Sequence, residues 1–227
     1  MHRIVGVAAL LLGLAMTAGA QTSLDVVDAD PQTLAQLTRI VESAKAANLP
    51  TDPLVAKASL ASRFHKSPAQ MIAAVQAVAT HLEDAREALG AATTPADVAA
   101  GADALGTKGV TKEMLRRIRV AQPDRSIAVP LGVMAVLVAS GVAPREAVDI
   151  VTRLVRGKAT NAQLVSLGND VSQDVMAGAG AASALQIRLE TLKPLLAYGA
   201  SAAAQAAELL NASGTSPKSP QNPRGRP

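Results

Sequence analysis

The chain has 227 residues, including 48 alanines, one phenylalanine, one tyrosine, no tryptophan and no cysteine. Without cysteine it forms no disulfide, no thiolate metal site and no thiol nucleophile, and the scarcity of aromatic side chains disfavours sheets. The formal net charge is +4, but acidic and basic residues are equal in number over residues 21–210, so the excess positive charge lies at the two ends. A neutral, aromatic-poor body argues against nucleic-acid binding.

Residues 1–20 have the pattern of a secretory signal peptide. A basic start precedes an apolar run over residues 4–16, and small residues then follow, with Ala18 and Ala20 in an A-x-A arrangement. We expect cleavage after Ala20 and a periplasmic or secreted mature protein without a transmembrane segment. The alternative is an uncleaved anchor, although the run is shorter than the roughly 20 residues that span a bilayer.

The mature chain is predicted to be all-α, because apolar residues recur at helical spacing along it. We expect a lead-in over 21–30 and a body of short packed helices over 31–210, in subgroups of about 31–90 and 95–210. Capping side chains before a proline mark three helix starts, at Asp30, Ser67 and Thr94. Further starts are expected at Thr51, Thr111, Ala143 and Thr160.

The spacing of these starts suggests a repeat. Helices begin in pairs every 32–34 residues, and the similar turns at Gly109 and Gly141 are 32 residues apart. This pattern predicts stacked helical hairpins, while the alternative is a set of ordinary helices of average length. Residues 127–139 are the most apolar stretch of the mature chain and predict a central core helix around which the others pack.

One local feature has the pattern of a binding surface. Lys112, Arg116 and Arg119 follow i, i+4, i+7 spacing and are expected to share one face of a helix. Such a face suits an anionic envelope surface or an acidic partner, and the alternative, which we favour, is an ordinary solvated face. The tail over 211–227 is rich in proline, carries three basic residues and no acidic one, and is predicted to be disordered.

No catalytic, cofactor-binding or metal-binding residue can be assigned. His65 and His81 are the only histidines of the mature chain and have no metal-ligand spacing, and sugar cleavage would need a cleft with aromatic surfaces. The leading hypothesis is therefore a non-enzymatic envelope protein that acts as a helical interaction or scaffold module. Its alternative is a hydrolase of cell-wall or small-molecule substrates with a carboxylate in a cleft between helices.

Two segments carry a resemblance to other proteins. Asn48-Leu-Pro-Thr-Asp-Pro-Leu-Val-Ala-Lys57 and Val138-Ala-Ser-Gly-Val-Ala-Pro-Arg-Glu-Ala147 resemble turn-and-helix segments of uncharacterised, alanine-rich exported bacterial proteins. The resemblance covers most of residues 33–190. It implies export and an all-helical fold, and it brings no assigned activity and no site residue.

Overall fold

A computed structural model of the protein describes residues 24–91 and 93–192. These residues form helices and no strand, which confirms the predicted all-α fold. The helices are η1 (Leu24–Val26), α1 (Pro31–Ala46), α2 (Asp52–Arg63), α3 (Pro68–Leu89), α4 (Pro95–Leu105), α5 (Lys112–Ala121), α6 (Ala128–Ala139), α7 (Pro144–Arg156), α8 (Asn161–Met176) and a further helix over 181–192. The predicted signal peptide with Ala18 and Ala20, and the tail over 211–227, lie outside the described residues.

Four helices, α1, α3, α4 and α8, begin where a capping side chain accepts hydrogen bonds from their first backbone N–H groups. Ser67 with Gln70 at α3, and Thr160 with Gln163 at α8, form complete capping boxes, as their spacing predicts. The carboxylate of Asp30 accepts hydrogen bonds from two N–H groups of α1. The starts of α2, α5 and α7 also lie at the predicted positions, although they have no side-chain cap.

Two glycine turns recur with the helices. Gly109 and Gly141, 32 residues apart, have φ angles of +90° and +97°, in the left-handed region that side chains disfavour. A Cβ atom at Gly109 would also lie 2.8 Å from Cγ of Pro144, at the start of α7. Glycine is therefore required at this position by the turn and by the close approach of another helix.

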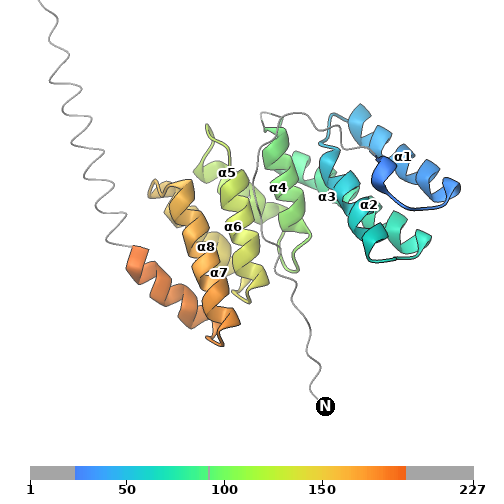
Figure 1. Ribbon diagram of the computed structural model, residues 1–227. Coiled ribbons are helices and arrows are strands. Elements are labelled where there is room, and N and C mark those ends of the chain that lie inside the picture. The colour runs from blue at the N-terminus through green and yellow to red at the C-terminus, as the bar shows by residue number, and fades with distance from the viewer. Residues whose placement is uncertain (1–23, 92, 193–227) are drawn as a thin grey trace, which may run out of the picture.

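The helices pack in two rows. In one row α4 contacts α6 and α6 contacts α8, and in the other α3 contacts α5 and α5 contacts α7. Pro95, Ala128 and Asn161, the first residues of α4, α6 and α8, follow each other at 33-residue intervals. Figure 1 shows these three helices side by side. In both rows, the helices that contact each other are two places apart along the chain. This pattern favours stacked helix pairs over an arrangement without a repeat.

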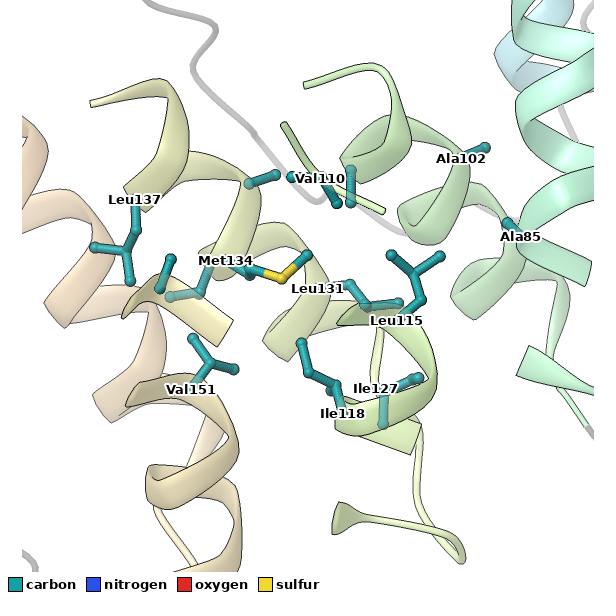
Figure 2. Packing of buried hydrophobic residues seen from close by; sticks show 14 of the residues in the cluster. Ala85, Ala102, Val110, Leu115, Ile118, Ile127, Leu131, Met134, Leu137 and Val151 are labelled. Carbon is teal, nitrogen blue, oxygen red and sulfur yellow. The ribbon is translucent and has the colours of Figure 1, made fainter. Parts of the chain in front are cut away.

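The apolar helix α6 occupies the centre, as predicted. It contacts α4, α5, α7 and α8, and six of its twelve residues are buried. Figure 2 shows Leu131 and Met134 of α6 among buried side chains that include Leu115 of α5 and Val151 of α7. Within residues 24–91 and 93–192, the helices lack the combination of length and apolar composition that crossing a bilayer requires.

The core continues across the boundary between the two expected subgroups. Leu89 near the end of α3 and Val98 in α4 belong to one buried cluster, and α3 packs against both α4 and α5. The long helix α3, the first member of its row, therefore connects α1 and α2 with the later helices.

Candidate functional site

The three basic residues that the sequence singles out all lie on α5, but they point to different partners. Lys112 extends from the start of α5 toward α3, where its Nζ lies 2.9 Å from Oε2 of Glu87 and 3.0 Å from Oδ1 of Asp84. The hydrogen bond to Glu87, and after it the hydrogen bond to Asp84, raises the pKa of Lys112 above its ordinary value. This lysine joins two helices at a partly exposed position.

Arg116 takes part in the same ion network. One of its terminal nitrogens lies 3.6 Å from Oε1 of Glu87, and the other lies 3.5 Å from Oε2 of Glu113. Glu87 of α3 thus forms ion pairs with both Lys112 and Arg116. Two of the three predicted residues are together, each with an acidic partner of the same chain.

Arg119 instead enters the interior. Its side chain is 17% exposed, and Nη2 lies 2.9 Å from Oδ2 of Asp97 on α4, whose side chain is 2% exposed. Nη1 donates to the backbone carbonyl oxygens of Gln122, Pro123 and Arg125 in the loop that follows α5. Arg119 therefore ties this loop to α4 rather than facing solvent.

Asp97 completes this connection, which we call the α4–α5 clasp (Asp97, Arg119, Ser126 and the N–H of Ile127). The second carboxylate oxygen of Asp97 accepts hydrogen bonds from Oγ of Ser126 at 2.7 Å and from the N–H of Ile127 at 2.8 Å. Burial by itself would raise the pKa of Asp97. The hydrogen bonds from Ser126, Ile127, Thr94 and Arg119 outweigh burial and hold this pKa below its ordinary value of 3.8.

The charged groups of Lys112, Arg116 and Arg119 therefore do not form one common basic surface. The i, i+4, i+7 spacing places their Cβ atoms along one side of a helix. A long arginine side chain can nevertheless reach a neighbouring helix, and Arg119 donates a hydrogen bond to Asp97 of α4 in this way. Contact of this trio with an anionic surface stays a prediction, and the ion pairs of Lys112 and the burial of Arg119 weigh against it.

A different group of residues surrounds a hollow between α5 and α7, which we call the α5–α7 hollow. Its volume is about 260 Å³, and it is lined by Glu113, Arg116, Arg117, Val120 and Arg156. Val120 is 71% exposed. The lining therefore combines one exposed apolar side chain with three arginines.

Arg117, Val120 and Arg156 are not among the residues that the sequence singled out. Arg117 pairs with Asp149 of α7, and these two residues are 32 residues apart, as are the turns at Gly109 and Gly141. The repeat spacing is therefore the signal that could have placed Arg117 beside α7. Nothing in the sequence marks Arg156 as a member of the same hollow.

A second hollow, of about 190 Å³, lies between α1 and α3. Its lining residues are Arg39, Ile40, Ser43, Ala44, Gln76, Ala79 and Glu83. Each of the two hollows contains one glutamate, and neither contains a histidine or a second carboxylate. Among the residues that the structure describes, no group of three or more histidine, aspartate or glutamate side chains is arranged to hold a metal ion.

Comparison with known proteins adds no relative: no protein-family model, no curated protein and no solved structure matches this chain.

Proposed function

We propose that the protein is an exported, non-enzymatic helical module that binds a partner protein in the cell envelope. The observation that carries this proposal is the two-row packing, in which α3, α5 and α7 form one row and α4, α6 and α8 the other. Stacked helix pairs bury a continuous core between their rows, and their outer faces together form an extended surface suited to binding another macromolecule.

The distribution of side chains on α7 supports this proposal. Its buried side is apolar except for Thr152, whereas all of its exposed positions are charged. These charged residues are Arg145, Glu146, Asp149, Arg153 and Arg156. A row of mixed charges on a rigid support can recognise a partner of complementary charge, because opposite charges attract the correct partner and like charges disfavour others.

Export is the second part of the proposal and is supported by residues 1–20. N-terminal sequencing of the protein from a periplasmic fraction should show a chain that begins at Gln21. Replacing Ala18 and Ala20 by arginine should block this processing, because the cleavage site needs small side chains. A wild-type chain that keeps its first residues, or that stays in the cytoplasmic fraction, would contradict export.

Partner binding is tested by cross-linking in intact cells at native expression level, followed by capture of the tagged chain. We expect a defined cross-linked species that is reduced when the outer face of α7 carries Arg145→Glu and Arg153→Glu. A matched variant, Arg63→Glu with Lys66→Glu, makes the same charge change near the end of α2 and should keep the species. If the wild-type chain gives no species above the background of an untagged strain, the proposed function is wrong.

A further inference from the structure

The α5–α7 hollow has the composition of a site for negative charge. Three of its five lining residues are arginines, and they come from two helices that are separated in the sequence by α6. Arginine binds carboxylates through two parallel hydrogen bonds and is enriched where protein interfaces have their strongest contacts. The single acidic lining residue, Glu113, is offset by its ion pair with Arg116.

The three arginines differ in whether they already have an acidic partner. Arg116 pairs with Glu87 and Glu113, and Arg117 pairs with Asp149. Among the described residues, the ion pairs do not include Arg156. An incoming carboxylate can therefore bind Arg156 without displacing an acidic side chain of this protein.

Val120 is the one apolar residue in the lining of the hollow. It is 71% exposed, and neighbouring arginine side chains have apolar stems that extend such a surface. A volume of about 260 Å³ lies below the roughly 300–1,000 Å³ of pockets for small organic ligands. This size suits one or two side chains of a peptide better than a separate small molecule.

The charges around the hollow also favour a peptide over a membrane or a polyanion. Glu87, Glu113 and Asp149 lie beside the arginines, with exposed side chains. A uniformly anionic surface would approach these carboxylates as closely as it approaches the arginines, which is unfavourable. A peptide can place separate carboxylates on the arginines and an apolar residue on Val120.

We propose that the α5–α7 hollow binds an acidic peptide segment of the partner protein, with one carboxylate on Arg156, a second near Arg117 and an apolar side chain against Val120. This inference rests on the proposed function, because it assigns the partner contact to one site. It also predicts the sequence character of the partner: acidic residues next to an aliphatic one.

The test uses the purified mature chain and three fluorescent twelve-residue peptides. The first alternates aspartate or glutamate with valine or leucine, the second replaces its acids by asparagine and glutamine, and the third replaces them by lysine. We expect fluorescence anisotropy to show salt-sensitive binding of the acidic peptide alone. Arg156→Gln should weaken this binding about tenfold, because a charge-assisted contact is lost.

Two further variants sharpen the assignment. Val120→Asp adds a carboxylate to the lining of the hollow and should abolish binding, while Arg63→Gln with Lys66→Gln should leave it unchanged. Circular dichroism melting must show that every variant remains folded. The inference fails if the acidic peptide does not bind at low salt, or if the control variant loses as much affinity as Arg156→Gln.

Anionic phosphatidylglycerol vesicles serve as the competing probe. Vesicle binding that exceeds peptide binding and needs Arg156 would overturn the peptide assignment in favour of a lipid surface. Cross-linking in cells then separates the two proposals. If the Arg156→Gln chain still gives the full cross-linked species, the hollow is not the partner site although the proposed function stands. If the wild-type chain gives none, the proposed function fails.

Discussion

Arg117 and Arg119 lie two residues apart on α5, and each pairs with an aspartate of another helix, yet their environments differ. Arg119 and Asp97 are 17% and 2% exposed, whereas Arg117 and Asp149 are 43% and 59% exposed. The α4–α5 clasp is therefore part of the interior, and the pair beside the α5–α7 hollow remains in contact with solvent. The same two residue types form a buried connection between helices in one place and a solvent-exposed one in the other.

The difference follows from solvation. An exposed pair gains little, because water screens both charges and the side chains lose freedom. A buried charge is costly to leave without its partner, so removing one member of a buried pair strongly destabilises the fold. The additional hydrogen bonds to Asp97 from Ser126 and Ile127 are those that a buried carboxylate needs.

The largest expected effect is that of Asp97→Ala, which leaves Arg119 buried without its counter-charge. We expect a loss of about 3–5 kcal/mol in the free energy of unfolding, measured by urea titration. Asp149→Ala removes the corresponding acid of the exposed pair and should cost less than about 1 kcal/mol. Equal losses in the two variants would remove the distinction between the clasp and the surface pair.

The pH dependence of stability gives a second measurement on the clasp. The pKa of Asp97 is lower in the folded chain than its ordinary value of 3.8. Its contribution is therefore complete above that value and is lost as pH falls through the lower folded-state pKa. We expect the stability difference between wild type and Asp97→Asn to shrink below about pH 4. A difference that stays constant through this range would contradict a charged Asp97 in the folded chain.

Replacing one glycine near the clasp and one in α6 by alanine compares how tightly the two regions are packed. A Cβ atom at Gly101, four residues after Asp97, would lie 3.0 Å from Cβ of Ala85 and 3.2 Å from Cδ2 of Leu115, whereas a Cβ atom at Gly132 would meet nothing within 4 Å. Gly101→Ala should cost about 1–3 kcal/mol through overpacking. Gly132→Ala should instead stabilise α6 by about 0.5–1 kcal/mol. Thermal unfolding of both variants should show shifts of opposite sign.

The smallest effect is expected at the exposed network of α3 and α5. The ion pairs raise the pKa of Lys112, so its charge is retained up to alkaline pH. Lys112→Gln should lower the melting temperature slightly at low ionic strength. The difference should vanish near 1 M salt, where the screening length is about 3 Å. A loss that persists at high salt would show that Lys112 contributes by packing instead of by charge.

Local signals in the sequence predicted where most of the helices begin. The helix starts at Ser67 and Thr160 were predicted because a capping side chain binds a backbone N–H group only three positions away. The apolar run over 127–139 predicted the central helix, because a helix that is apolar on all sides must be covered by others. The repeat spacing indicated paired helices but left their packing open.

Tertiary structure alone decided what the basic residues of α5 do. Helical spacing places Lys112, Arg116 and Arg119 along one side of the helix, but the positions of Asp84, Glu87 and Asp97 on other helices direct their charged groups. Arg156 reaches the hollow beside α5 only because α5 and α7 pack together. A long side chain has several reachable partners, and burial selects among them. The composition and patterning of this sequence therefore specify a helical protein with a neutral, aromatic-poor body, while the packing of its helices separates the interior clasp from the candidate binding surface.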